Sequence, residues 1–504
     1  MKHASVPLLI LALVTSPFDA GAQPALTIYN QNFAVVREHV PLELKAGENA
    51  VTFSGVTVHL EPDSVVLRDP TGKVALSVLE QSYRADTISP GLMLSLYEGK
   101  DVDFLVRDQN AKEYTVRGRV IRSGYIPNAG AAIPYGPQFY QRQQLLGQEA
   151  GTPIIAVDGK LRFSLPGEPI FPALADDAIL KPLLTWKLAS SQAAKVDAEL
   201  SYITGGMSWQ AAYNLVAPEK GDTLDIVGWV SIDNQSGKQF DDAVLKLMAG
   251  DVNKLQPGET DNEFRMRDEM MAKAAAIAPV TEKAFDEFHL YALPRPTTLR
   301  NRETKQVEFV RATGVKATTF YVYNGAAIGP QYRGWNPDMI RNNPDYGTQS
   351  NPKVWVMREF KNSQDNHLGL PLPKGRTRFY RRDEADGRLE FTGENMISHT
   401  AKDETVRLYT GDAFDLVGER KRTNYALSNR QDSAEESFEI RVRNHKTEPV
   451  EVRVTERLYR WVNWAIVENS HDFEKTDAQT VEFRVTVPAQ GETVVTYRVR
   501  YDWK

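Results

Sequence analysis

The sequence predicts a mostly β protein of several antiparallel β-sandwiches, with an inserted small SH3-like barrel and one short helical insertion. Apolar residues recur at every second position in many runs, as on strands with one buried face. These runs end at turn-forming residues, which include many of the 33 glycines and 28 prolines. With 504 residues, of which 41% are hydrophobic, the chain exceeds a single core and fits several domains.

The clearest strand pattern lies between Leu200 and Asn253. Within it, every second residue of 224–232 is apolar or glycine, and the run breaks at the turn-forming residues 234–237. We therefore expect this segment to form central strands of a β-domain.

Composition and turn spacing divide the chain into six segments. We expect a signal peptide over 1–22, an N-terminal β-sheet region over 23–91, a small barrel-like insertion over 92–182, central β-sandwich strands over 183–253, a flexible or helical insertion over 254–285, and a C-terminal β-sandwich region over 286–504. The barrel is expected where strands become short and evenly spaced.

The first residues have the layout of a secretory signal peptide. Lys2 precedes an apolar run over 6–14, and small residues at 20–22 offer a cleavage site. The run is well short of the roughly 20 residues that span a bilayer. We expect cleavage after Ala22 and a periplasmic or secreted protein with no transmembrane helix.

The chain contains no cysteine, which excludes disulfides, thiolate metal sites and a lipoprotein anchor. Its formal net charge is -6, and no basic stripe is present. A nucleic-acid partner is therefore not expected.

Three pairs of neighbouring strand patterns are expected to form hairpins. They lie within 42–53, 65–79 and 481–501, and the first turns at Gly47. The last pair would close the C-terminal sandwich.

Two irregular loops carry aromatic side chains among glycine, proline and polar residues. Loops of this length are often functional because a rigid scaffold can present them. The predicted binding residues are Tyr135, Phe139 and Tyr140 in the first loop and Tyr332, Trp335 and Tyr346 in the second.

The segment 263–278 is rich in strong helix formers. Met266, Met270, Ala274 and Ile277 fall near one helical face, which predicts a short surface helix. A methionine-rich partner face and a Cu(I) thioether site are the alternatives.

No catalytic constellation stands out. Ser470-His471-Asp472 has the residue types of a triad, but a triad needs folded convergence and no Gly-x-Ser-x-Gly elbow is present. The histidines are scattered without a His-Glu-x-x-His motif, so no metal and no cofactor are expected.

Several acidic and aromatic positions have ordinary interpretations. The calcium-like run 383–387 lacks the full loop spacing and is interpreted as a turn. The carboxylate pairs Asp241-Asp242 and Asp412 with Asp415 are interpreted as strand-edge charge. Large aromatic residues in strand-like context are expected in cores, and these are Trp209, Tyr213, Trp461 and Trp464.

An internal similarity links residues 228–247 with 438–456. Both run strand, asparagine, turn, strand. Duplication and shared sandwich patterning explain it equally well.

The motifs of the chain resemble a bacterial family, the domain of unknown function 4139, which includes mucoidy-inhibitor-A-like proteins. The resemblance rests on 27–36, 200–253, the Leu-Pro-x-Gly run at 372–375, the His-Thr pair at 399–400 and the Gly-Asp-Ala-Phe-Asp run at 411–415. It implies a fold but no activity. Mucoidy-inhibitor-like relatives carry a long coiled coil between their halves, and this chain shows no sustained heptads.

These observations favour an exported, non-enzymatic β-sandwich scaffold that binds a protein or polysaccharide of the cell envelope. The alternative is an envelope glycan or peptide hydrolase that uses carboxylates in an inter-domain cleft.

Overall fold

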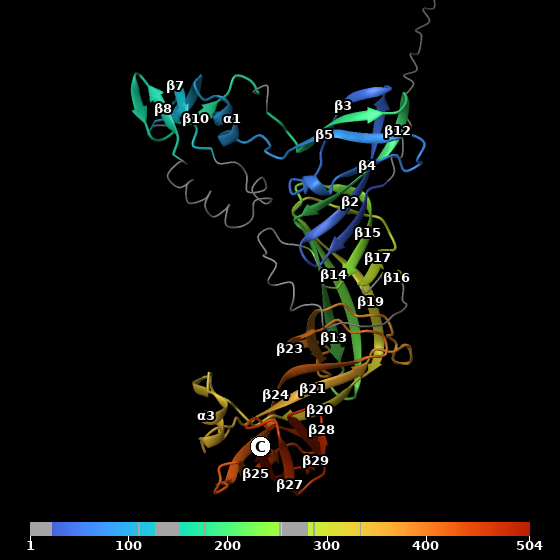
Figure 1. Ribbon diagram of the computed structural model, residues 1–504, viewed down its shortest axis with the longest axis vertical. Helices are drawn as coiled ribbons and strands as arrows, with labels where there is room; N and C mark the ends of the chain where they lie inside the picture. Colours follow the sequence, from blue (N-terminus) through green and yellow to red (C-terminus); the bar gives the residue numbers. More distant parts are fainter. Residues whose placement is uncertain are drawn as a thin grey trace, which may run out of the picture. The chain divides into compact units, whose positions relative to one another are not determined.

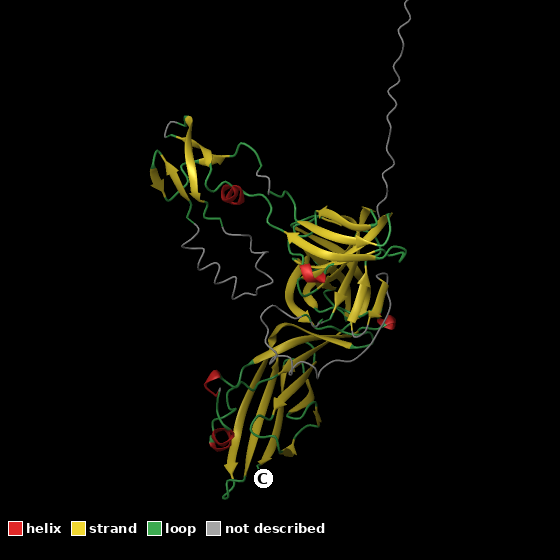
Figure 2. Cartoon of the chain, turned by 45° about the horizontal axis from the view of Figure 1, so that its top comes forward, coloured by secondary structure: helices red, strands yellow, loops and turns green. Residues whose placement is uncertain are grey.

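The computed structural model describes residues 23–108, 111–125, 152–174, 178–250, 252, 254, 281–285, 288–332 and 334–503. The chain is mostly β, as the sequence predicts (Figure 2). The predicted signal peptide and the predicted helix within 263–278 lie outside the described residues.

The α-helices of the described residues are α1 (Pro90–Leu96) and α3 (Pro337–Asn342). Each begins after a residue, Ser89 or Asn336, whose side chain accepts a hydrogen bond from a main-chain N–H of the first turn. In this part of the chain, no helix has both the length and the apolar character needed to cross a membrane. The short 3₁₀ helices are η1 (Pro62–Ser64), η4 (Pro330–Tyr332) and η5 (Gln364–Asn366).

The first sheet has eight strands in the order β16-β17-β15-β1-β2-β12-β4, with β18 also paired to β15 (Figure 1). β1 runs parallel to β15 and antiparallel to β2. The strands are β1 (Ala25–Tyr29), β2 (Phe33–Leu44), β4 (Val66–Arg68), β12 (Ala194–Gly205), β15 (Phe240–Ala249), β16 (Thr281–Phe285), β17 (Phe288–Ala292) and β18 (Thr297–Leu299).

A three-stranded sheet, ordered β3-β11-β5, corrects two predicted hairpins. It contains β3 (Gly47–Ser54), β5 (Leu76–Arg84) and β11 (Leu183–Ser190). β2 and β3 follow each other in sequence but belong to different sheets, and so do β4 and β5. Gly47 has φ +93°, a conformation that suits glycine where the chain turns between β2 and β3.

The predicted small barrel is a five-stranded antiparallel sheet in the order β10-β6-β7-β8-β9. Its core contains Phe104, Val120 and Ile155, together with Met93 and Leu94 of α1. No pairing between β10 and β9 closes a barrel in the described residues, so the sheet is open there. The strands are β6 (Asp101–Arg107), β7 (Glu113–Arg122), β8 (Ile154–Val157), β9 (Lys160–Arg162) and β10 (Glu168–Ile170).

A second five-stranded sheet has the order β19-β14-β13-β22-β23. Its members are β13 (Met207–Ala217), β14 (Thr223–Asn234), β19 (Glu303–Lys316), β22 (Gly375–Arg382) and β23 (Leu389–Ile397). β13 runs parallel to β22, so the sheet is mixed. Trp209 and Tyr213 of β13 are 3% and 2% exposed, which confirms their predicted place in a core.

The largest sheet has nine strands in the order β27-β30-β25-β24-β21-β20-β26-β29-β28. They are β20 (Thr318–Tyr323), β21 (Lys353–Lys361), β24 (Thr405–Leu427), β25 (Ser433–Asn444), β26 (Val450–Arg457), β27 (Trp464–Asn469), β28 (Phe473–Lys475), β29 (Thr480–Val487) and β30 (Gly491–Asp502). Trp461 and Trp464 pack, partly buried, against the core that this sheet encloses.

The predicted closing hairpin of β29 and β30 is wrong. β29 pairs with β26, whereas β30 pairs with β25. The apolar side chains of both strands enter one core, where the rings of Phe483 and Tyr497 lie 5.7 Å apart. The two strands therefore contribute to the same core while their main-chain ladders are formed with different strands.

The chain divides into two compact units. The first comprises Met1–Trp209, Ile232–Met270 and Ala292–Lys305, and the second comprises Gln210–Ser231, Met271–Tyr291 and Gln306–Lys504. The site described below lies wholly within the second unit.

The strand pairings repeat within the chain. β14, β15, β18 and β19 are connected and paired as β25, β26, β29 and β30 are. The hairpin of β1 and β2, with β1 parallel to β15, matches that of β20 and β21, with β20 parallel to β26. The internal similarity seen in the sequence therefore corresponds to a repeated sandwich topology.

Asn234 and Asn444 occupy equivalent corners of the two copies. Asn234 Nδ2 donates to the carbonyl oxygens of Lys238, Leu299 and Arg300, and its Oδ1 accepts from the Ser236 N–H. Asn444 makes the same pattern of contacts with Glu448, Val487, Pro488 and Lys446. Both asparagines are buried, at 0% and 1% exposure, so each satisfies main-chain groups where a strand turns.

Candidate functional site

The second predicted aromatic loop is the candidate functional site. It joins β20 to β21 and is called the aromatic loop here (residues 324–352). In the first copy of the sandwich, only residues 30–32 join the equivalent strands β1 and β2. Tyr135, Phe139 and Tyr140 of the other predicted loop lie outside the described residues.

The aromatic loop brings Tyr332, Trp335 and Tyr346 together. The ring of Tyr332 meets Trp335 edge to face at 4.9 Å and Tyr346 at 5.2 Å, and Trp335 stacks on Tyr346 at 6.3 Å. Tyr346 is buried, while Tyr332 and Trp335 keep part of their surface in solvent. Tyr346 is thus the inner member of the cluster, and the other two form its accessible side.

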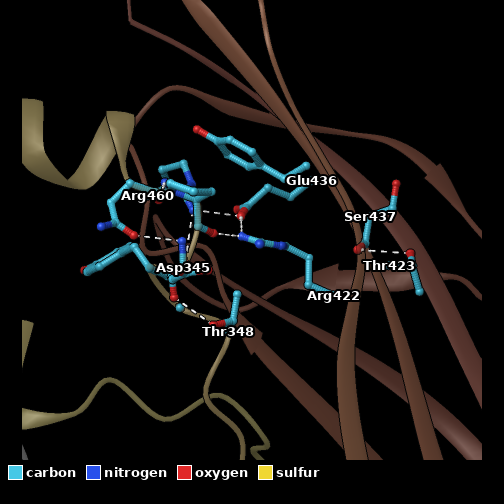
Figure 3. Close-up of polar contacts among 12 residues, drawn as sticks. Asp345, Thr348, Arg422, Thr423, Glu436, Ser437 and Arg460 are labelled. Carbon is cyan, nitrogen blue, oxygen red and sulfur yellow. Dashed lines mark hydrogen bonds and ion pairs between the residues drawn. The ribbon is translucent and has the colours of Figure 1, made fainter.

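Arg460, which follows β26, fixes this loop through main-chain carbonyl groups (Figure 3). Its Nη1 donates to the carbonyl oxygens of Ile340 at 2.6 Å and Asn343 at 3.0 Å. Its Nη2 donates to the Tyr346 carbonyl oxygen at 3.1 Å and to Glu436 Oε1 at 2.8 Å. One guanidinium therefore joins three points of the loop to the sandwich.

Two further arginines extend this attachment. Arg422 of β24 donates to the Pro344 carbonyl oxygen and, at 3.2 Å, to Glu436 Oε1, which Arg460 also contacts (Figure 3). Arg420 of the same strand donates from Nη1 to the Gly347 carbonyl oxygen at 2.7 Å. The loop thus receives hydrogen bonds from three arginine side chains of the sandwich.

The charge of Arg420 is compensated inside the core. Its Nε lies 2.9 Å from both carboxylate oxygens of Glu456, and the Tyr497 hydroxyl donates to the same carboxylate at 2.5 Å. Arg420 and Glu456 are 6% and 0% exposed. Burial opposes the charged form of Arg420, but Glu456 and Tyr497 hold its pKa above the ordinary range.

Arg460 is likewise a buried arginine whose charge is stabilised by a glutamate. Burial works to lower its pKa, yet the hydrogen bond and the charge of Glu436 raise it above the ordinary value. Burial also raises the pKa of Tyr346, which keeps that phenol neutral. The loop therefore rests on permanently charged arginines whose carboxylate partners are buried with them.

A cation-aromatic contact adds to the site at α3. The Arg341 guanidinium lies 4.2 Å from the ring centre of Trp461 and 5.8 Å from that of Trp503. The Tyr425 hydroxyl donates to the Arg341 carbonyl oxygen at 3.0 Å. Trp461, predicted to be in a core, thus packs partly buried against the core and also contacts the Arg341 guanidinium of the loop.

Sequence reasoning missed the arginines and glutamates of this site. A signal was present, because Glu436 lies between the buried Ala434 and Phe438 at the inward positions of β25. Glu456 likewise continues the inward run of Val452 and Val454. A charge at an inward strand position indicates a buried partner of opposite charge.

The run Ser470-His471-Asp472, which has the residue types of a triad, does not form one. Ser470 Oγ lies 2.8 Å from His471 Nδ1, but it also accepts a hydrogen bond from the Thr496 N–H at 2.9 Å. In the described residues, no hydrogen bond joins Asp472 to His471, so the acid that orients the histidine of a triad is missing. Asp412 contacts Lys353 Nζ at 2.8 Å, which holds its pKa below the ordinary value.

A shallow groove of about 320 Å³ on the outer face of the large sheet contains Glu439 and Glu468. Each carboxylate already pairs with an arginine, Glu439 with Arg441 at 3.0 Å and Glu468 with Arg498 at 2.5 Å. The groove is also lined by hydroxyl and amide groups, including that of Asn469. The aspartates selected from the sequence do not line it.

The calcium-like run is a turn, as interpreted from the sequence. The Gly387 N–H donates to the Asp383 carbonyl oxygen at 2.8 Å, and Asp383 Oδ1 accepts from the Ala385 N–H at 2.8 Å. Within the described ranges, no group of three or more histidine, aspartate and glutamate side chains could hold a metal ion.

Comparison with known proteins adds a family. The model of the Domain of unknown function (DUF4139) matches residues 198–504, more than half of the chain. No curated protein matches the chain.

Proposed function

Because the chain belongs to the DUF4139 family, whose description carries no activity, we propose its function from the site alone: an exported, non-enzymatic scaffold that binds a cell-envelope polysaccharide through the aromatic loop. The observation that carries the proposal is the attachment of this loop by Arg420, Arg422 and Arg460. A loop fixed before binding avoids the entropy cost of ordering during binding.

The chemistry of the accessible side supports a sugar ligand. Tyr332 and Trp335 present partly exposed aromatic faces, and aromatic rings with a polar edge suit surfaces that are half apolar and half wet, as sugars are. A protein partner would use the same anchors and is the other outcome of the test below.

Binding to envelope polysaccharides tests the proposal. We expect Trp335→Ala and Tyr332→Ala to weaken binding at least about tenfold, the range of a lost aromatic anchor. Trp355→Ala is the matched control, because Trp355 is a half-buried tryptophan of β21 that contacts Tyr409 outside the loop. Trp335→Phe keeps an aromatic ring and should retain most of the affinity.

Unchanged binding by both alanine variants would remove the loop from the function. Pull-downs from envelope fractions provide the second arm, and capture of a protein in place of glycan would assign a protein partner. If glycans and envelope proteins both fail to bind, the scaffold proposal is wrong.

Export is part of the proposal and has its own test. The amino-terminal layout and the lack of cysteine support a periplasmic or secreted location. N-terminal sequencing of the protein from the periplasmic or culture fraction should start at Gln23. A chain that retains Met1 in the cytoplasmic fraction would contradict this.

The hydrolase alternative has one observation in its favour, the shared groove of Glu439 and Glu468. Both carboxylates are already engaged by arginine side chains, which favours binding over hydrolysis. Release of reducing ends or free peptide ends by the parent chain, lost in Glu468→Gln, would support the hydrolase instead.

A further inference from the structure

Arg358 is a buried arginine that forms no ion pair with any residue that the structure describes. It lies on β21, is 7% exposed, and sits at an inward position between Val354 and Phe360, both buried. Among the described residues its Nη1 has no hydrogen-bond acceptor, and no carboxylate lies within ion-pair distance of the guanidinium. Buried charges in proteins are normally paired or bound to a ligand.

The contrast with Arg420 and Arg460 is direct. Those two arginines are also buried, but each contacts a buried glutamate that keeps its pKa above the ordinary value. For Arg358, burial lowers the pKa and the nearby positive charge of Arg381 lowers it further. Arg358 therefore lacks the buried carboxylate in direct contact that the other two arginines possess.

The groups facing Arg358 come from three other elements. Arg381 is at the end of β22, Asp222 precedes β14, and Tyr321 is on β20. Asp222 favours the charged arginine from beyond ion-pair distance, and its side chain is exposed. Arg381 is exposed as well, so of these two neighbouring positive charges one is buried and the other is in contact with solvent.

We propose that Arg358 and Arg381 form an anion-binding site that takes a small oxyanion group, a carboxylate or a phosphate. The guanidinium offers several N–H donors in a fixed fork that matches both groups. The bound anion supplies the charge that Arg358 lacks, while exposed Arg381 attracts it from solvent. The site is independent of the aromatic loop and goes beyond the proposed scaffold function.

Thermal unfolding and calorimetric titration of the full mature chain test this site. The protein is exchanged into a low-anion buffer and titrated with sodium phosphate, sodium acetate, sodium glucuronate and, for ionic strength, sodium chloride. We expect saturable binding of phosphate or of the carboxylates with a rise in Tm, and no saturable effect of chloride. Which arm saturates at lower concentration assigns the group.

Three variants separate a ligand site from a structural role. Arg358→Met should abolish the anion-dependent rise in Tm while leaving the Tm in low-anion buffer equal or higher, because an uncompensated charge is removed. Arg381→Gln, at an exposed position, should weaken binding at least tenfold without loss of folding. Asp222→Asn should tighten binding, because it removes the competing carboxylate.

The matched control is Arg500→Met, since Arg500 is exposed and lies 3.2 Å from Asp502. It should leave the anion response unchanged. A lower Tm for Arg358→Met in low-anion buffer, together with an anion response equal to that of the parent, would overturn the proposal. So would equal responses to chloride and phosphate, or a loss of stability in Asp222→Asn with no gain in affinity.

Discussion

Replacing Arg460 by methionine should release the aromatic loop from the sandwich. The substitution keeps an unbranched side chain of similar reach but removes the donors to Ile340, Asn343 and Tyr346. It also leaves Glu436, which is 3% exposed, with Arg422 as its remaining arginine partner. The loop and the buried carboxylate are therefore perturbed together.

The magnitude follows from burial. Removing one partner of a buried ion pair costs about 3–5 kcal/mol, because the other charge stays behind uncompensated. Arg422, at 3.2 Å from Glu436, offsets part of this, so the expected loss of local stability is about 3 kcal/mol. Such a loss corresponds to a roughly hundredfold larger equilibrium constant for opening of the loop.

Hydrogen exchange detected by mass spectrometry can measure this locally. The relevant amides are protected within the loop, for example Ile340 N–H bonded to the Asn336 carbonyl oxygen and Asn343 N–H bonded to that of Met339. We expect peptides covering 336–348 to exchange about a hundredfold faster in Arg460→Met. Peptides from β13 should be unchanged.

Arg500→Met is the control, since its guanidinium is exposed and contacts Asp502 at 3.2 Å. It should leave the exchange of 336–348 within error. If Arg460→Met exchanges in the loop like the parent chain, the loop is held by its own aromatic cluster, and the reasoning about arginine attachment is refuted.

Three further predictions concern other buried polar groups. Glu456→Leu should destabilise the second unit by about 3–5 kcal/mol in denaturant unfolding, whereas the double variant Arg420→Met/Glu456→Leu should recover most of this; a double variant no better than the single one would contradict the pairing. Asn234→Ala and Asn444→Ala should each cost about 1–3 kcal/mol by the same measurement, because each leaves buried carbonyls unpaired, and a cost at one corner only would argue against their equivalence. Burial lowers the pKa of His59, so the first unit should lose stability as pH falls below about 6.5. Hydrogen exchange of β12 measures this pH dependence, which His59→Gln should flatten. An equal pH profile in parent and variant would exclude His59 as its source.

The predicted strands were found, but three predicted pairings were not. Alternation reports that one face of a strand is buried, and it does not report which strand supplies the hydrogen bonds. In 481–501 both strands place apolar side chains in one core, although each is paired with a different neighbouring strand. Their sequence pattern is therefore the same as that of a hairpin. Assignment of partners depends on contacts far apart in sequence, such as β1 with β15.

The candidate site was also predictable only in part: its aromatic residues could be predicted from the sequence, and the arginines that hold them could not. The aromatic loop stands out because Tyr332, Trp335 and Tyr346 interrupt a run of asparagine, glycine and proline. Its attachment did not stand out, because Arg420 and Arg460 resemble the many surface arginines of the chain until their burial is known. Charge at inward strand positions is the feature to search for in similar sequences.

The unequal turns of the two sandwich copies have a consequence for engineering. The short turn at 30–32 offers a template for trimming the aromatic loop, since the flanking strands pair alike. Trimming alone would leave guanidinium groups of the sandwich without the loop carbonyl groups that accept their hydrogen bonds. A shortened protein that still folds must therefore replace Arg460 and its neighbouring arginines by apolar side chains at the same time. The loop and the arginines that hold it can only be changed together.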